Sequence, residues 1–164
     1  MVEAYLDIET TGLSAYNDII TVIGIYINDG PRHEIIQLVG KEVTKDNLLN
    51  ALQGVDVIYT YNGSRFDIPF IATALDIDLA CIFSHHDLMI DCWKNNLYGG
   101  FKRVESILGI YRELKGLSGL DAVRLWWKYL NNDDENALGM LLRYNEEDVV
   151  NLRILKDRLG VGCD

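Results

Sequence analysis

The sequence predicts an α/β domain in which a mixed β-sheet is flanked by α-helices. The first third alternates between apolar and polar residues or is rich in β-branched ones, which is typical of strands. Apolar residues in the second half recur at helical spacing. Helices are interposed between the strands and accumulate later in the chain, an order that favours a mixed-sheet α/β domain.

The length of the chain favours a single domain. Its 164 residues are enough to bury a core of their own. No linker, internal repeat or low-complexity segment interrupts them. We therefore expect residues 1–164 to form one domain.

The first strand is predicted over residues 2–9, because their side chains alternate between two environments. One face of this strand is apolar and consists of Ala4, Leu6 and Ile8. The opposite face carries Tyr5, Asp7 and Glu9. The strand is thus expected to pack one face into the core and to present two acids on the other.

Three further strands and a helix are predicted in the first half. Residues 19–27 are rich in β-branched side chains, and the turn sequence 28–31 predicts a hairpin with residues 34–39. Thr44 is expected to cap a short helix that extends through Gln53. Residues 55–61 are almost all apolar or aromatic, as a central strand covered on both faces would be.

The remainder of the chain is predicted to be helical. Asp67 precedes an early proline, the pattern of an N-cap acid at a helix start. Loops are expected where glycine, asparagine or aspartate residues cluster, at 99–100, 116–119 and 131–134. A long helix follows from residue 135 to Leu159 and ends at Gly160.

The chain is strongly acidic. Lysine and arginine number 15 against 25 aspartate and glutamate residues, a net charge of −10, whereas proteins that bind nucleic acid non-specifically are usually basic. A nucleic-acid ligand would therefore be expected to bind weakly, with its contacts concentrated at one strand end. Basic residues are denser in one segment, where they form either a solvated helix surface or a substrate contact: Lys94, Lys102, Arg103, Arg112, Lys115, Arg124 and Lys128.

Composition also bears on location. No apolar stretch reaches the roughly 18 to 20 residues that a membrane span requires, so no contact with a membrane is expected. The three cysteines (Cys81, Cys92 and Cys163) are an odd number without the spacing of a disulfide framework, which suits a reducing compartment. The expected location is cytoplasmic.

Asp7 and Glu9 are the first candidate site residues. Two positions apart in a strand, they project from one face with backbone positions about 6.5 to 7 Å apart. That spacing lets both carboxylates approach a pair of divalent cations about 3.5 to 4 Å apart. Asp-x-Glu alone also occurs by chance on solvated strands, but the tight turn predicted over residues 10–13 leaves these acids at a sheet edge where ligands bind.

Asp67 and Asp148 are the other candidate acids. Asp67 is a helix N-cap, a carboxylate that faces the strand ends, or both. Asp148 belongs to an apolar stripe of the last predicted helix, where a lone buried carboxylate is costly and a metal ion would compensate it. Tyr144 lies one turn earlier on the same face and is either a core aromatic or a hydroxyl that orients or helps to deprotonate the nucleophile. Glu146 and Glu147 lie off the stripe and are expected to be solvated.

Together these segments resemble the DEDD exonuclease superfamily of the ribonuclease H-like fold, in its tyrosine branch (DEDDy). Asp7 and Glu9 match the first motif, Asp67 the second and Tyr144-x-x-x-Asp148 the third; the histidine branch would place histidine at position 143, which is arginine here. Three segments of the second half resemble the YprB-type ribonuclease H-like domain: Val104-Glu105-x-x-Leu108-Gly109-Ile110, Gly119-x-Asp121-Ala122-Val123-x-Leu125-Trp126 and Leu142-x-Tyr144-Asn145-x-x-Asp148-Val149.

The resemblance implies a site with two ions, Mg²⁺ or Mn²⁺, held by oxygen ligands. Asp7 would bridge both ions, Glu9 and Asp148 would hold the ion that activates water, and Asp67 would reach the other ion through water. Thr10 and Leu13 would meet the terminal nucleotide, and Asn62 would support the site. The implied activity is hydrolysis of single-stranded or frayed RNA or DNA from the 3′ end, with release of nucleoside 5′-monophosphates.

Two other functions remain compatible with the sequence. One is a nucleic-acid-binding or scaffold module that keeps the fold without the chemistry, and the other is a structure-specific endonuclease. The presence of all four acids with Tyr144 favours a catalytic site over a scaffold, and the tyrosine motif favours an exonuclease. The acidic balance makes a recruiting protein partner plausible, although no residue identifies one.

Three further groups carry weaker signals. A zinc site is disfavoured because the cysteine and histidine residues lack paired spacing (Cys81, His85, His86 and Cys92). Asp87 and Asp91 lie between the second and third motifs, and Asp91 is either a fifth acid near the metals or, as we expect, a helix cap. The three tryptophans are expected to pack in the core and not to stack on bases: Trp93, Trp126 and Trp127.

Overall fold

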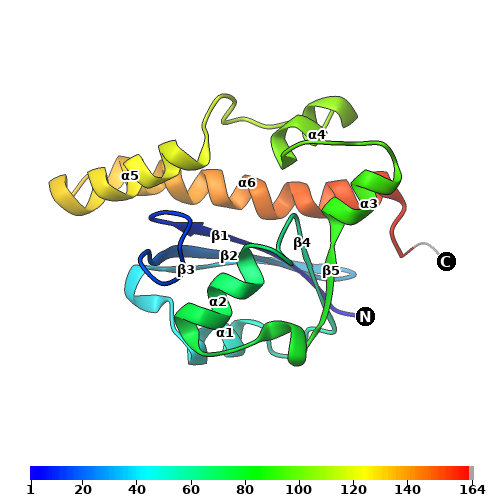
Figure 1. Ribbon diagram of the computed structural model, residues 1–164, viewed down its shortest axis with the longest axis horizontal. Coiled ribbons are helices and arrows are strands. Elements are labelled where there is room, and N and C mark those ends of the chain that lie inside the picture. The colour runs from blue at the N-terminus through cyan, green and yellow to red at the C-terminus, as the bar shows by residue number, and fades with distance from the viewer. Residues whose placement is uncertain (163–164) are drawn as a thin grey trace.

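The computed structural model describes residues 1–162 and confirms the predicted class, a five-stranded mixed sheet with helices on both faces (Figure 1). The strands are β1 (Glu3–Thr10), β2 (Ile20–Asp29), β3 (Arg32–Val39), β4 (Val57–Thr60) and β5 (Ser84–Asp87). The helices are α1 (Lys45–Ala51), α2 (Asp67–Leu75), α3 (Leu88–Lys94), α4 (Phe101–Leu108), α5 (Gly119–Asn132) and α6 (Glu135–Leu159). Cys163 lies outside the described residues.

The sheet has the order β3-β2-β1-β4-β5, which places β1 at its centre. The first three strands in the chain pair antiparallel, whereas β4 runs parallel to β1 and β5 runs parallel to β4. The centre of the sheet is therefore the strand that carries Asp7 and Glu9. These two residues pair with β2, whereas the pairing of β1 with β4 covers only Glu3–Tyr5.

The two faces of β1 belong to two different cores, as its alternation predicts. Ala4, Leu6 and Ile8 are buried in a cluster with Leu48 of α1 and Ile71 of α2. Tyr5 is buried on the opposite face against residues of α6. Figure 1 shows α6 crossing that face, with α1 and α2 on the other. Asp7 and Glu9 consequently project towards α6.

Several local predictions are confirmed. Thr44 caps α1, because its side chain accepts a hydrogen bond from the Asn47 amide at 3.2 Å. The hairpin turns at Gly30, whose φ of 66° is the left-handed conformation that glycine adopts easily. Helix α6 ends at Leu159, and Gly160 follows as a left-handed C-cap.

Three local predictions are corrected. Strand β5 was not expected, because Ser84–Asp87 is too short and polar to show alternation; it pairs with β4 at the sheet edge. The loop expected at 131–134 begins later, since α5 continues through Asn132. Asp67 is the first residue of α2 and makes no capping bond; Phe66 occupies the cap position.

Within residues 1–162, no helix is both long and apolar enough to cross a membrane.

Candidate metal and catalytic site

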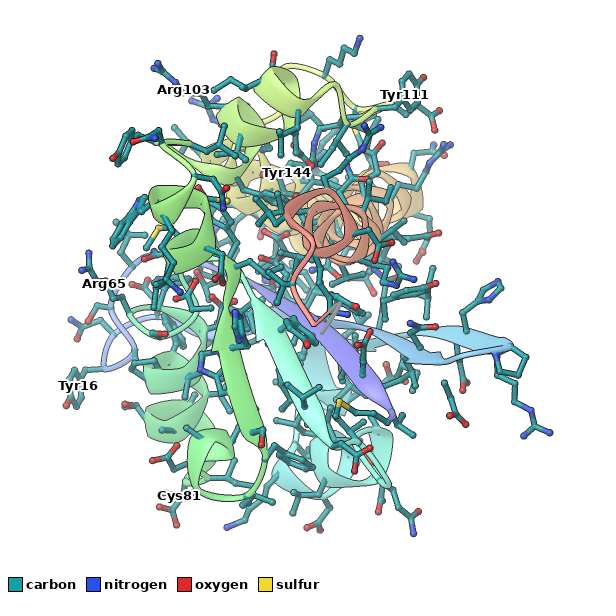
Figure 2. The ribbon with its side chains drawn as sticks, turned by 90° about the vertical axis from the view of Figure 1, so that its right-hand side faces the viewer. Tyr16, Arg65, Cys81, Arg103, Tyr111 and Tyr144 are labelled. Atoms are coloured by element: carbon teal, nitrogen blue, oxygen red, sulfur yellow. The ribbon has the colours of Figure 1, made fainter. Side chains whose placement is uncertain are left out.

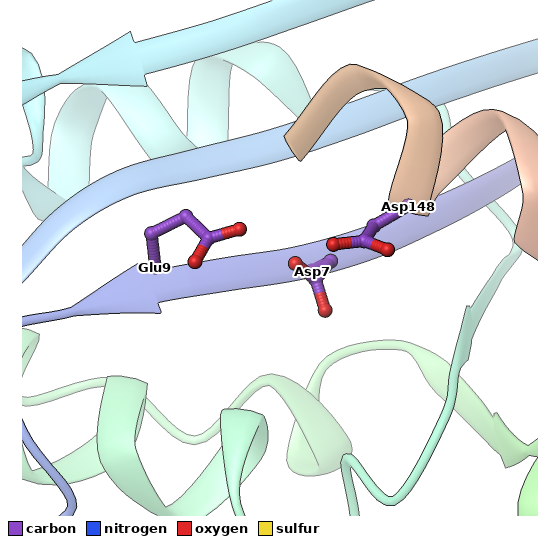
Figure 3. Close-up of side chains that lie close together, drawn as sticks. All are labelled: Asp7, Glu9 and Asp148. Atoms are coloured by element: carbon purple, nitrogen blue, oxygen red, sulfur yellow. The ribbon is translucent and has the colours of Figure 1, made fainter. Parts of the chain in front are cut away.

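Three of the predicted acids meet between β1 and α6. One carboxylate oxygen from each of Asp7, Glu9 and Asp148 lies within 4.8 Å of the others. Figure 3 shows the two strand acids and the helix acid turned towards a common space. The strand alternation that buries Leu6 and Ile8 on one face and the helical stripe that buries Asp148 together produce this convergence.

The residues fit a hard divalent cation. All the converging ligand atoms are carboxylate oxygens, which Mg²⁺ and Mn²⁺ prefer. Glu9 is only 7% exposed, and its buried Oε1 atom has no hydrogen-bond partner within residues 1–162. A buried carboxylate oxygen without a partner is costly, and a bound cation would supply the missing interaction.

The acids also raise one another's pKa values. Burial raises the pKa of Asp7 and of Glu9 well above their usual range, and the Asp148 charge raises both further. Burial raises the pKa of Asp148 to about 6, against the opposing effect of the Arg112 charge. The protein thus holds three carboxylates where, without a cation, their ionised forms repel each other.

Asp67 lies beside this group, close enough for its charge to raise the pKa of Asp7. It is buried, and its Oδ1 atom accepts a hydrogen bond from the Ile8 amide at 3.1 Å. Burial raises the pKa of Asp67 to about 7. This carboxylate therefore ties the start of α2 to the end of β1, at the edge of the site.

Arg112 supplies a buried counter-charge to the helix acid. It is 6% exposed and donates a hydrogen bond from Nη2 to Asp148 Oδ1. Its Nε and Nη2 atoms also donate to Glu105 at 2.9 and 2.7 Å. Asn151 completes this network by donating to Glu105 at 2.7 Å. Asp148 is therefore fixed in position by a connected set of side chains from α4, α6 and the loop between α4 and α5.

Tyr144 is buried one helical turn before Asp148, as predicted, and Lys102 covers it. Lys102 Nζ donates a hydrogen bond to the Tyr144 hydroxyl oxygen and lies 4.1 Å from the centre of its ring. A second bond, from Nζ to the Leu117 carbonyl at 2.6 Å, fixes the lysine. Burial and the Asp148 charge raise the pKa of Tyr144, so its hydroxyl keeps its proton at neutral pH.

Asn145 links the site to the sheet. Its Nδ2 atom donates to the Asp7 carbonyl and carboxylate, each at 3.3 Å, while Gln37 donates to its Oδ1 at 3.0 Å. Asn145 packs so closely on β2 that a Cβ atom at Gly24 would lie 2.0 Å from its Oδ1. Glycine at position 24 therefore permits the approach that holds Asp7.

Of the three residues predicted to bind substrate or support the site, two line a cavity beside Glu9 and one does not. Thr10 and Leu13 line a cavity of about 420 Å³ beside Glu9, together with Phe66 and with Leu120 of α5. Leu13 is 87% exposed at the mouth of the site. Asn62 is not part of this lining. Its φ of 63° makes the turn after β4, and its amide donates to Asp87 at 2.8 Å.

The other acidic residues have structural roles. Asp87 caps α3 by accepting a hydrogen bond from the Met89 amide at 3.1 Å. The capping prediction for Asp91 is wrong, because its carboxylate pairs with His86 and Lys94, outside the acidic group. Glu147 is not a solvated side chain but accepts hydrogen bonds from the amides of Glu113 and Leu114.

The cysteine–histidine cluster and the three tryptophans were the weaker sequence signals. Within residues 1–162, Asp7, Glu9 and Asp148 form the one group of three or more potential metal ligands, and the cysteine–histidine cluster does not assemble. Trp126 is buried, as predicted, whereas its neighbour Trp127, which cannot share the same helix face, is 45% exposed. Trp93 is half-buried, with Arg65 5.4 Å above its ring.

Sequence reasoning missed the roles of Lys102, Glu105, Arg112 and Asn145. Lys102 and Arg112 stood out only as members of a basic segment, and Glu105 and Asn145 only as motif letters. Arg112 reaches Asp148 across 36 residues of chain. No helical or strand periodicity connects positions so far apart, so the tertiary fold alone reveals this pair.

Comparisons with known proteins agree with this architecture. The profile of the RNase H superfamily matches residues 4–160. The family B DNA polymerase of the hyperthermophilic archaeon Pyrobaculum calidifontis is similar with a TM-score of 0.75 at 17% identity, over 97% of this chain and 24% of the polymerase. Brucella melitensis NrnC bound to pGG is similar with a TM-score of 0.67 at 24% identity, over 96% of this chain and 71% of NrnC.

At these identities the structural likeness shows the fold. The chain spans about a quarter of the polymerase and most of NrnC. No curated protein sequence matches the chain.

Proposed function

The chain belongs to the RNase H superfamily, and we propose that it is a metal-dependent nuclease, specifically a 3′–5′ exonuclease. Its substrates are phosphodiester bonds at the 3′ end of single-stranded or frayed RNA or DNA. The observation that carries this proposal is the convergence of Asp7, Glu9 and Asp148, whose ligand oxygens lie within 4.8 Å of one another with a buried Glu9 oxygen left without a partner. The tyrosine one turn before Asp148 supports the DEDDy assignment.

The four acids would together coordinate two divalent ions, Mg²⁺ or Mn²⁺. Asp7, Glu9 and Asp148 would hold one ion, with Asp7 shared between both, and Asp67 would complete the second position. When bound, such ions lower the pKa of the attacking water and stabilise charge on the scissile phosphate. Brucella melitensis NrnC has been solved with bound Mg²⁺, which supports this choice of cofactor.

Tyr144 orients the attacking water or the scissile phosphate and does not act as the base. Its hydroxyl oxygen accepts a bond from Lys102, and its pKa is raised. The hydroxyl proton therefore remains available for donation into the site, next to Asp148. Lys102 occupies one acceptor position of the hydroxyl oxygen, so it restrains the position of the tyrosine beside Asp148.

The cavity beside Glu9 suits a terminal nucleotide. Its lining is predominantly apolar and carries no lysine or arginine, so it offers packing surface for a base and a sugar. Thr10, Leu13 and Leu120 of α5 all contribute to this lining. The pGG ligand of NrnC supports a nucleic-acid substrate. Cytoplasmic location and a recruiting protein partner stay predictions.

A gel time course on 5′-labelled single strands of RNA and DNA tests this function. The wild-type protein with Mg²⁺ or Mn²⁺ is expected to give a ladder that shortens from the 3′ end, and EDTA or Asp7→Ala is expected to abolish it. Asp91→Asn, which removes an acid outside the converging group, serves as the matched control and should cleave normally. Cleavage of a circular single strand would instead indicate an endonuclease, and a ladder that survives in Asp7→Ala would refute the site.

A further inference from the structure

The site opens on two sides that differ in charge. On the Glu9 side lies the apolar cavity described above. On the other side lies a cavity of about 300 Å³ that shares Asp7, Tyr144 and Asp148 with the site. Its remaining lining comes from the end of β4 and the start of α4: Tyr61, Gly100, Phe101, Lys102 and Arg103.

The charge of each lining indicates which part of a strand it receives. The terminal nucleotide of a 3′ end brings only the scissile phosphate, whereas the strand on the 5′ side adds a phosphate at every linkage. A lining without cations fits the first, and a lining with Lys102 and Arg103 fits the second. We propose that the Tyr61–Arg103 cavity, defined by Tyr61 and residues 100–103, binds the nucleotide on the 5′ side of the scissile bond. This assignment rests on the proposed exonuclease function.

Arg103 is the residue free to contact the upstream phosphate. It is exposed at the start of α4, and within residues 1–162 its guanidinium forms no ion pair. Figure 2 shows it extending outward from α4, whereas Tyr144 lies further inside. Its aliphatic stem packs so closely on Gly99 that a Cβ atom there would lie 2.6 Å from Arg103 Cδ.

Lys102 is already committed inside the cavity. Its bonds to Tyr144 and to the Leu117 carbonyl hold it against the catalytic tyrosine. The two neighbouring basic side chains thus have different roles. Lys102 positions Tyr144, and Arg103 remains available to contact the nucleic-acid strand. A substitution at Arg103 consequently tests the strand contact without disturbing the bond to Tyr144.

Tyr61 and Phe101 form a firm apolar wall for the same cavity. Their rings are stacked, with centroids 5.1 Å apart and an interplanar angle of 24°. The Tyr61 hydroxyl donates to the Gly99 carbonyl at 2.6 Å, which ties β4 to the segment before α4. A base or sugar that packs on a half-buried aromatic pair needs no specific edge contacts, so this wall fits a nucleotide of any sequence.

Arg103→Gln tests the assignment, with Arg32→Gln as the matched control. Arg32 is also exposed and carries the same charge, but it begins β3, at the edge of the sheet opposite β4 and β5. Binding of a fluorescent single strand is measured in Ca²⁺ over a series of salt concentrations. Arg103→Gln is expected to weaken binding roughly fivefold and to reduce the salt slope by about 0.7, the value for one phosphate contact on a single strand. Arg32→Gln is expected to match the wild type.

A second substrate separates this assignment from the proposed function. The p-nitrophenyl ester of thymidine 5′-monophosphate reports on the metals and the terminal cavity, because it has no upstream nucleotide. Arg103→Gln is expected to lower the ratio of kcat/KM for the strand to kcat/KM for the ester roughly fivefold. An unchanged salt slope, or equal losses on both substrates, overturns the assignment. Wild-type protein that hydrolyses neither substrate refutes the exonuclease function instead, and the binding slopes then decide only whether Arg103 contacts a single strand.

Discussion

β1 and α6 supply the acids of the site, and these acids differ in whether a protein cation compensates their charge. On β1, the buried Glu9 carboxylate has an oxygen without a partner, and Asp7 receives the neutral amide of Asn145. On α6, Asp148 is paired with the buried guanidinium of Arg112. We therefore expect the acids of β1 to need a bound metal ion, whereas Asp148 of α6 already has the Arg112 guanidinium as its counter-charge. This difference separates the residues that we expect to govern metal binding from those that we expect to govern stability.

Removing the buried guanidinium of Arg112 should have the largest effect on stability. Arg112→Met keeps much of the side-chain volume but leaves Asp148 and Glu105 buried without their partner, and it is expected to lower the free energy of unfolding by about 3 to 5 kcal/mol. Urea denaturation in EDTA measures this change.

The matched control is Arg143→Met, which breaks the exposed pair with Glu113 and should cost less than about 1 kcal/mol. Equal losses in the two variants would show that Asp148 does not need its arginine, and the contrast between strand and helix would disappear.

Tyr144→Phe should lower kcat roughly tenfold and leave KM nearly unchanged, because the hydroxyl orients a reactant and does not remove a proton. The raised pKa of Tyr144 also predicts that the alkaline side of the pH–rate profile is the same in both proteins. Steady-state rates across the pH range provide the measurement. A loss in the range of about 10²- to 10⁴-fold, typical of a lost general base, together with a changed alkaline limb, would make Tyr144 the base.

The smallest expected effect concerns the pH dependence of stability, which the buried acids of the site determine. The pKa of Asp67 is raised to about 7 and that of Asp148 to about 6, and those of Asp7 and Glu9 are also raised. Carboxyl groups with raised folded-state pKa values stabilise the fold while they are protonated, and this contribution is lost as pH rises from about 4 to about 7. Metal-free protein should therefore become less stable over that range.

Asp7→Asn removes one of the repelling charges, so in EDTA at about pH 8 it should stabilise the protein by roughly 1 kcal/mol and flatten the pH dependence. Thermal unfolding at several pH values compares it with the wild type. A variant that is less stable than the wild type throughout would show that the ionised Asp7 is already compensated within the protein.

Much of this arrangement follows from local periodicity. The alternation of residues 2–9 placed Asp7 and Glu9 on the face opposite Leu6, and the stripe of the last helix placed Tyr144 and Asp148 towards the sheet. Both patterns repeat within a few residues, so the sequence displays them directly. Their convergence on one space then follows from packing the helix on the strand.

Other features depend on contacts between distant segments. Arg112, Lys102 and Asn145 act through partners that only tertiary packing brings near: Asp148, Tyr144 and Asp7. Of the two roles considered for Asp67, the capping role is wrong because Phe66 occupies the cap position, and the Asp67 carboxylate accepts a hydrogen bond from the amide of Ile8 on β1. β5 was missed because four polar residues show no alternation and are held by pairing with β4.

Mn²⁺ binding, followed by the loss of the free-ion paramagnetic resonance signal, tests the central claim most directly. The wild-type protein and Asp91→Asn are expected to bind the ion alike, because Asp91 pairs with His86 and Lys94 outside the site. Asp7→Asn, which removes a ligand from the group of three acids, is expected to weaken binding by at least about tenfold while remaining folded. Equal Mn²⁺ binding by Asp7→Asn and the wild type would contradict the metal site on which the proposed nuclease depends.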